Sequence, residues 1–325
     1  MELLYFLEGI RNPVCDFFFS AITHLGEETL FLVIAILMFW CVDKRRGYYV
    51  LITGFFGTII NQLMKLWLKI PRPWVKDPNF TVVGDAKVEA TGYSFPSGHS
   101  QTAVGTFGGI AVTSKRNWVK IICIAIAILV PVSRMYLGVH TPWDVLAGSG
   151  CAILLLLLLE PLFFNEKLHE KAMPFIVGAV FLASVAFFLY AVVFTPASED
   201  ENVISAAHNA CTLLGCSFGL ILVYILDTYL VKFETEAPWY CQIIKLGVGL
   251  GIVLLIKAVL KSPLLALMGD NYERIVRYFL IVAFAGGVWP MTFGFFAKLR
   301  IPVLDRFGEW VASLFKGKAK DKSAQ

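Results

Sequence analysis

Charged residues are scarce in this sequence. They make up 16% of its 325 residues, while hydrophobic residues make up 58% and the mean hydropathy is +0.71. Soluble globular domains carry about 25% charged residues, so an ordinary soluble protein is excluded. The formal net charge is only +4, and the Lys and Arg residues gather in short patches between apolar runs. That pattern is typical of a polytopic membrane protein and excludes an extended nucleic-acid-binding face.

Cysteine pairs and metal-ligand clusters are also lacking. The seven cysteines are odd in number, lie mostly inside apolar runs and show no metal-site spacing, so we interpret them as small buried hydrophobic residues. No carboxylate cluster suited to Mg²⁺ is present, and we expect neither a metal nor a cofactor. The first residues, MELLYFLEGIRNPV, have no basic segment ahead of the apolar ones. This predicts an amphipathic segment on the membrane or on the protein, rather than a cleavable signal peptide.

Long apolar runs, by contrast, fill most of the chain. A transmembrane helix needs about 20 apolar residues, and this criterion predicts an all-α fold, a polytopic membrane helical bundle with about nine spans. The first and third runs are somewhat short. The predicted spans are 28–42, 47–68, 99–114, 117–135, 143–164, 173–195, 203–231, 240–261 and 275–297.

The loops between these spans predict the topology. One side carries the basic stretches DKRRG, SKRNWVK, NEKLHEK and KFETEAP, and the positive-inside rule assigns it to the cytoplasm. The N-terminus and the loops 71–95 and 137–142 then lie outside, and the C-terminus inside. The C-terminal stretch 301–325 combines an apolar stripe at helical spacing with lysines. Such a stretch is either an interfacial helix at the inner leaflet or a helix packed on the protein.

Several polar residues converge at the predicted outer ends of spans two to five. Ionisable residues at membrane depth are costly and raise a functional hypothesis. Each also has a structural explanation: Lys65 and Arg134 could extend to the interface, and Asp144 could complete a capping box with Thr141. Together, however, they predict a single outward-facing pocket. Its members are Lys65, Arg72, Ser97, Gly98, His99, Arg134, His140 and Asp144.

These residue types suit phosphoryl transfer. Three cations can neutralise the oxygens of a transferring phosphoryl group. Gly98 lets the backbone approach an oxygen closely, and the start of the third span points amides at the anion. The stretch PSGH would therefore hold a phosphate. His140 has Asp144 four residues on, which favours a nucleophilic imidazole held by a carboxylate, and His99 is left as the acid that protonates the leaving oxygen.

The same residues resemble the three motifs of the type 2 phosphatidic acid phosphatases (PAP2). These motifs are a Lys, six residues and Arg-Pro; Pro-Ser-Gly-His; and Ser-Arg, five residues, His, three residues and Asp. Here they stand at 65–73, 96–99 and 133–144 with spacing and identity intact. The resemblance implies His140 as nucleophile, Asp144 as its orienting group and His99 as general acid. It also implies a metal-independent phosphate site formed by Lys65, Arg72, Ser97, Gly98 and Arg134.

The resemblance covers about residues 1–164, which we expect to be a PAP2-like catalytic membrane domain with the amphipathic N-terminal segment. Residues 165–300 are then additional transmembrane helices without an assignable role, and 301–325 an amphipathic, basic cytoplasmic tail. Stretches such as SRMYLGVHTPWDVLAG look similar to bacterial lipid phosphatases. This implies an integral protein of a bacterial cytoplasmic membrane with its site on the extracytoplasmic face.

The leading hypothesis is hydrolysis of a lipid phosphomonoester or pyrophosphate through a phosphohistidine, in a vanadate-sensitive reaction. Candidate substrates are phosphatidate, phosphatidylglycerol phosphate, sphingoid or isoprenoid phosphates and undecaprenyl diphosphate. A glucose-6-phosphatase-like enzyme acting on a soluble ester, and phosphotransfer to another acceptor, stay open. A lipid transporter that only binds the head group is a further alternative, although binding alone needs no nucleophile, orienting group and separate acid. The sequence leaves the oligomeric state open.

Overall fold

The computed structural model describes residues 1–90, 92–196 and 200–320, and all regular secondary structure in them is helical. This confirms the all-α prediction. In the first half of the chain the helices are α1 (Glu2–Gly9), α2 (Pro13–Thr23), η1 (His24–Gly26), α3 (Glu28–Leu37), η2 (Met38–Val42), α4 (Lys44–Leu68), α5 (Pro73–Lys76), α6 (Ala86–Glu89), α7 (Gly98–Thr113), α8 (Asn117–Tyr136) and α9 (Pro142–Phe164). In the second half they are α10 (Glu166–Phe188), η3 (Leu189–Phe194), α11 (Glu201–Leu226), η4 (Asp227–Val231), α12 (Trp239–Ala283), η5 (Phe284–Val288), η6 (Trp289–Thr292), α13 (Phe293–Lys298) and α14 (Pro302–Lys320).

The predicted count of nine spans is not confirmed. In the described part of the chain, 6 helices are long and apolar enough to cross a membrane, or 7 if the bent pair Pro13–Gly26 and Glu28–Val42 is one span. The 16-residue α7 is not among them, because it is shorter than the 18 residues that a candidate span needs. The segment Trp239–Lys298 counts once, although it contains a break at Gly269, where φ is +79°.

This break lets α12 double back on itself. Arg277 Nη1 donates to the carbonyl of Lys257 at 3.4 Å, and Trp289 Nε1 donates to the carbonyl of Lys245 at 3.2 Å. The two hydrogen bonds join residues before Gly269 to residues after it, and the pair farther from Gly269 in sequence lies farther out on both sides. This is the pattern of an antiparallel helical hairpin. Gly is suited to the turn because a positive φ costs it little.

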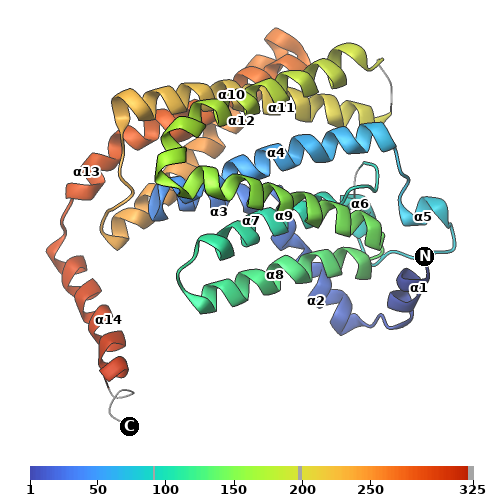
Figure 1. Ribbon diagram of the computed structural model, residues 1–325, viewed down its shortest axis with the longest axis horizontal. Helices are drawn as coiled ribbons and strands as arrows, with labels where there is room; N and C mark the ends of the chain where they lie inside the picture. Colours follow the sequence, from blue (N-terminus) through green and yellow to red (C-terminus); the bar gives the residue numbers. More distant parts are fainter. Residues whose placement is uncertain (91, 197–199, 321–325) are drawn as a thin grey trace.

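The two ends of the bundle differ in composition (Figure 1). The turns from α7 to α8 and from α9 to α10, which carry basic residues, lie at one end, with α14 and the C-terminus. The N-terminus, α5 and α6 lie at the opposite end. The structure thus separates the basic turns from the loop 71–95, as the sequence predicts. Which end faces outside stays a prediction.

The N-terminal segment packs on the protein. Arg11 donates to the carbonyl of Tyr136 from Nε at 3.1 Å and from Nη2 at 3.0 Å, and to the carbonyl of Thr81 at 3.1 Å. Phe6 and Phe17 stay 64% and 79% exposed, so an apolar face remains on the outside of this segment. Of the two predicted places, on the membrane or on the protein, the contacts of Arg11 correspond to the second.

At the other end of the chain, α14 runs away from the bundle (Figure 1). Trp239 Nε1 donates to the carbonyl of Leu304 at 3.4 Å, and the Trp239 ring also packs against Phe307 with the two planes tilted by 51°. Val303 and Trp310 are exposed. The predicted basic tail that follows lies outside the described side chains, and an interfacial role for this helix stays a prediction.

Candidate active site

A cavity of about 340 Å³ lies at the end of the bundle that carries loop 71–95. Its walls come from α3, α4, α7 and α11, with the loop and the α8–α9 connection closing one side. Ser97 and Asp144 lie directly behind this wall, in contact with residues that form it. The fold thus brings the predicted site residues, which are spread from Lys65 to Asp144 in the sequence, to one place. The predicted site residues that line the cavity are Lys65, Arg72, Gly98, His99, Arg134 and His140.

His140 is almost fully enclosed, with 2% of its surface exposed. Its Nε2 lies 2.9 Å from Nη1 of Arg72. A guanidinium only donates hydrogen bonds, so Nε2 must be the acceptor and the ring hydrogen must be on Nδ1. That Nδ1 faces Oδ2 of Asp144 at 3.5 Å, longer than a hydrogen bond. This tautomer leaves the free lone pair on Nε2, the ring nitrogen that faces the Arg72 guanidinium.

Burial and neighbouring charge both act on this imidazole. His140 lies in the connection between two candidate spans. Removal from water, followed by the positive charges of Arg72, Arg134 and Lys65, lowers the pKa of His140 well below its ordinary value of 6.5. The imidazole is therefore neutral at neutral pH, which is the form that can act as a nucleophile.

Asp144 serves as a helix cap and as the partner of His140 at the same time. It is 1% exposed, and its Oδ2 accepts hydrogen bonds from the Thr141 amide at 2.7 Å and from Ser94 Oγ at 2.6 Å. Thr141 Oγ1 accepts from the Asp144 amide at 3.3 Å, which completes the predicted capping box. These bonds fix the carboxylate beside Nδ1 of His140.

The PSGH stretch starts α7 and rests on the start of α9. Ser97 is the N-cap of α7, and its amide donates to the Asp144 carbonyl at 2.9 Å. Its hydroxyl accepts from Ser100 Oγ at 2.8 Å and is fully buried, so Ser97 does not line the cavity. Gly98 is open: a Cβ there would have only Asn61 Oδ1, at 3.8 Å, within 4 Å. The helix start thus presents an uncovered backbone to the cavity, as an anion site requires.

The three predicted cations are each held by neutral groups. Lys65 Nζ donates to the carbonyl of Tyr93. Arg72 donates from Nε to the Gly92 carbonyl at 3.0 Å and from Nη1 to the Val139 carbonyl at 2.9 Å. Arg134 is 1% exposed and donates from Nη1 to Thr23 Oγ1 at 2.7 Å. These partners are backbone carbonyl and hydroxyl oxygens, which orient the three cations around one part of the cavity.

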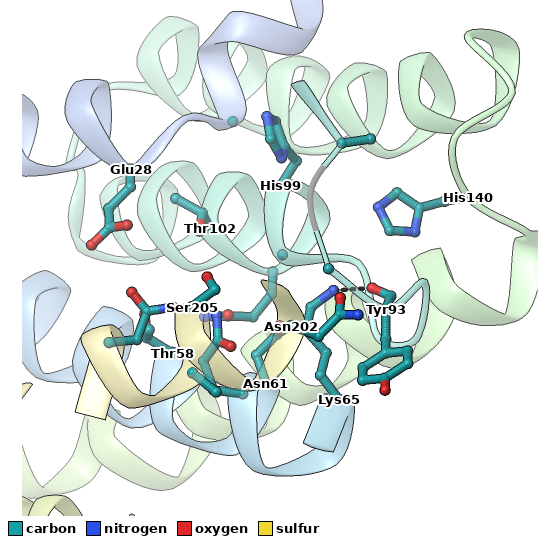
Figure 2. A pocket seen from close by; sticks show the side chains of 18 of the residues that line it. Glu28, Thr58, Asn61, Lys65, Tyr93, His99, Thr102, His140, Asn202 and Ser205 are labelled. Atoms are coloured by element: carbon teal, nitrogen blue, oxygen red, sulfur yellow. Dashed lines mark hydrogen bonds between the residues drawn. The ribbon is translucent and has the colours of Figure 1, made fainter. Parts of the chain in front are cut away.

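Sequence reasoning missed two contributions to this site. Thr23 of α2 binds Arg134 from 111 residues away, and no local pattern indicates it. The second is a face of α11, where Asn202, Ser205 and Asn209 line the cavity and two of them are visible in Figure 2. Their spacing of three and four residues inside an apolar run was the available signal.

The prediction of metal-independent chemistry stays a prediction. Within the described residues, no group of three or more His, Cys, Asp or Glu side chains is arranged to hold a metal ion.

Comparison with known proteins now identifies the family. Residues 45–168 match the PAP2 superfamily, and residues 211–300 match the PAP2 superfamily phosphatase transmembrane extension. Phosphatidylglycerophosphatase B of Bacillus subtilis is 33% identical over 50% of this chain and 80% of its own length. The chain belongs to the PAP2 superfamily. It is an integral membrane phosphatase, a hydrolase of phosphoric monoesters or diphosphates.

Other relatives extend the comparison. Human sphingosine-1-phosphate phosphatase 2 is 23% identical over 82% of this chain and 70% of its own length. A crystal structure of a transmembrane PAP2-type phosphatidylglycerolphosphate phosphatase from Bacillus subtilis matches 51% of this chain and 84% of its own, with 30% identity and a TM-score of 0.42. The family assignment agrees with the motif resemblance.

Proposed function

We propose that this PAP2 protein hydrolyses a lipid phosphomonoester or pyrophosphate through a phosphohistidine formed on His140. The observation that carries the proposal is the state of His140: neutral, with its lone pair on Nε2 beside the Arg72 guanidinium. A phosphate bound by Arg72 would bring its phosphorus within reach of that nitrogen. The names of the relatives support a lipid substrate, since several are lipid phosphatases.

In the first step, Nε2 of His140 attacks phosphorus and the bond from phosphorus to the lipid oxygen breaks. The leaving oxygen takes a proton from His99, which carries that proton once the negative phosphate offsets the neighbouring cations, so the products are the alcohol and a phosphorylated imidazole. Asp144 stabilises the positive charge that develops on His140. Lys65, Arg72 and Arg134 neutralise the phosphoryl oxygens, together with the open backbone at Gly98. Ser97 contributes by holding the start of α7 in place.

In the second step, water attacks the phosphohistidine. His99, now neutral, accepts a proton from that water, and the bond between phosphorus and Nε2 breaks. Inorganic phosphate leaves and both histidines return to their starting states. No metal ion takes part in either step of this proposal.

The proposed orientation places the site on the extracytoplasmic face. The cavity lies at the end of the bundle opposite the basic turns, and basic turns favour the cytoplasm. A lipid keeps its phosphate at the depth of the membrane surface, where this end of the bundle would lie. The orientation is tested with the variants Lys76→Cys and Lys167→Cys and a thiol reagent that does not cross the membrane. Added outside intact cells, the reagent should label the cysteine at position 76 and not the one at position 167.

The chemistry is tested by phosphate release from purified protein in detergent, without added metal. Wild-type protein should release phosphate, His140→Ala should not, and His169→Gln should match the wild type because His169 lies at the other end of the bundle. An alkali-stable, acid-labile phosphoryl label should appear on the wild type and on His169→Gln, but not on His140→Ala. Inorganic vanadate should inhibit, since it adopts the geometry of the transferring group. Loss of activity in EDTA that Mg²⁺ restores would refute the metal-independent mechanism.

A further inference from the structure

The wall of the cavity contributed by the C-terminal extension is polar. Asn202, Ser205 and Asn209 lie along one face of α11 and line the cavity from the side opposite α7. The neighbouring part of α4 adds the polar side chains of Asn61 and Gln62. Polar side chains on an apolar membrane helix destabilise the protein unless they form hydrogen bonds, because unsatisfied polar groups in an apolar environment cost free energy. The stripe therefore indicates a ligand or water on this face.

Several of these groups have hydrogen-bonding capacity to spare. Ser205, Asn209 and Gln62 make no side-chain hydrogen bond with the described residues. Glu28 of α3 also lines the cavity and forms no hydrogen bond or ion pair within the described part of the chain. Figure 2 shows Glu28 and Ser205 on the side of the pocket away from His140. A second region of the cavity thus offers amide, hydroxyl and carboxylate groups beyond the proposed phosphate position.

The extension is also fastened to the phosphate end of the site. Tyr93 OH donates to Oδ2 of Asp200 at 3.1 Å, just before α11, while the Tyr93 carbonyl accepts from Lys65. Asn202 Oδ1 lies close to Gly92, where a Cβ would come within 3.7 Å of it. These contacts set the register of α11 against the loop that carries Tyr93, so the polar face of α11 has a defined position relative to the cations.

The charges in the cavity are distributed unevenly. Its Lys and Arg lining residues, within the described part of the chain, are Lys65, Arg72 and Arg134, all in the proposed phosphate position. The extension's Lys257 and Arg274, although close in sequence to the hairpin turn, do not line it, and Arg274 pairs with Asp270 at 3.3 Å. The second region is therefore lined by one carboxylate and by no Lys or Arg side chain, and Lys257 acts on Glu28 without lining the cavity. This lining disfavours a second anionic group there.

We infer that α11 of the extension completes the site as a head-group subsite, and that the substrate's head group is non-anionic and carries hydroxyl or amino groups next to the phosphate. This rests on the proposed function and narrows its substrate class. A head group of this kind would hydrogen-bond to Ser205 and Asn209, and an ammonium would also be attracted by Glu28. A second phosphate or a bare alkyl chain would leave these groups without partners, at a cost.

The test compares two lipids that differ only in the head group. Sphinganine 1-phosphate and octadecyl phosphate share a saturated C18 chain, and only the first has an amino and a hydroxyl group. The full-length wild type should show a kcat/KM for sphinganine 1-phosphate at least about tenfold higher, since one hydrogen bond to a charged group corresponds to roughly that factor. Asn209→Leu and Ser205→Ala should each reduce this ratio, Asn209→Leu by about tenfold. Ile204→Ala, on an exposed position of the same helix, should keep it.

Each outcome has a distinct meaning. If the ratio of kcat/KM values falls in Glu28→Gln as well as in the α11 variants, the subsite recognises an ammonium group on the substrate. If it falls only in the α11 variants, the subsite recognises a hydroxyl group. Both results support the subsite. A ratio near one in the wild type and in every variant overturns it while leaving the proposed phosphatase intact. Faster hydrolysis of farnesyl diphosphate than of sphinganine 1-phosphate also overturns the non-anionic class. If folded wild type releases no phosphate from any of these lipids, the proposed function itself fails, and release from glucose 6-phosphate alone would assign a soluble ester instead.

Discussion

Gly148 offers the sharpest test of how the active-site loop is positioned. A Cβ on Gly148 would lie 2.4 Å from the carbonyl oxygen of Ser97, and real Cβ atoms essentially never approach closer than 3.0 Å. In Gly148→Ala, α9 and the Ser97 backbone must therefore separate by several tenths of an ångström. Both partners are backbone, so no flexible side chain can absorb the change. Overpacking of this kind costs about 1–3 kcal/mol.

The displacement acts directly on the site, because Ser97 and Gly98 start the helix that carries His99. A misplacement approaching 1 Å can cost about 100-fold in rate, so kcat/KM for phosphate release should fall about 10- to 100-fold. Gly150→Ala is the matched control, since it adds the same methyl to the same helix with nothing within 4 Å. That variant should keep full activity and gain up to about 1 kcal/mol of helix propensity. Thermal unfolding and phosphate release are measured on both variants. Equal stability and activity of the two would refute the close approach of α9 to the Ser97 carbonyl.

Three further predictions concern the groups around the phosphate position. Thr23→Val removes one acceptor of Arg134 and should raise the vanadate inhibition constant about tenfold or more, while Thr23→Ser should retain wild-type inhibition; no difference between the two variants would show that this bond does not position Arg134. Asp144→Asn should lower kcat by about three to four orders of magnitude with a smaller change in KM, and single-turnover phosphate release measures it; a kcat near that of the wild type would remove Asp144 from the mechanism. Because the pKa of His140 is lowered, its neutral form should persist as the pH falls through 6.5; an imidazole NMR titration of the free enzyme with a midpoint at or above 6.5 would contradict this.

The extension changes how the chain is divided. The sequence predicts a catalytic part at 1–164 and additional helices at 165–300. The cavity, however, takes one wall from α11, and the Tyr93–Asp200 hydrogen bond joins the two parts. We therefore propose that the first helices of the extension belong to the site, and that a variant truncated at Asn165 would lack its head-group wall.

The sequence by itself determined the membrane character, the all-α fold and the residues that gather at the phosphate position. Long apolar runs have no other stable arrangement in lipid than helices, and fixed spacings at the ends of successive spans place Lys65, Arg72, His99, Arg134 and His140 together. The capping box of Asp144 was also readable, because it depends on residues three apart.

Other features depend on contacts between distant elements and were decided only by the tertiary structure. The hydrogen bond between Thr23 and Arg134 spans 111 residues, and the burial of Ser97 behind the cavity depends on the approach of Gly148. The break at Gly269 divides the long helical segment α12 into two helices that form a hairpin. The spacing of the polar residues on α11 could be recognised in the sequence, but what they face could not. The packing of α11 beside α4 turns them toward the cavity, and which face of a helix meets which neighbour is set by the packing of the whole bundle.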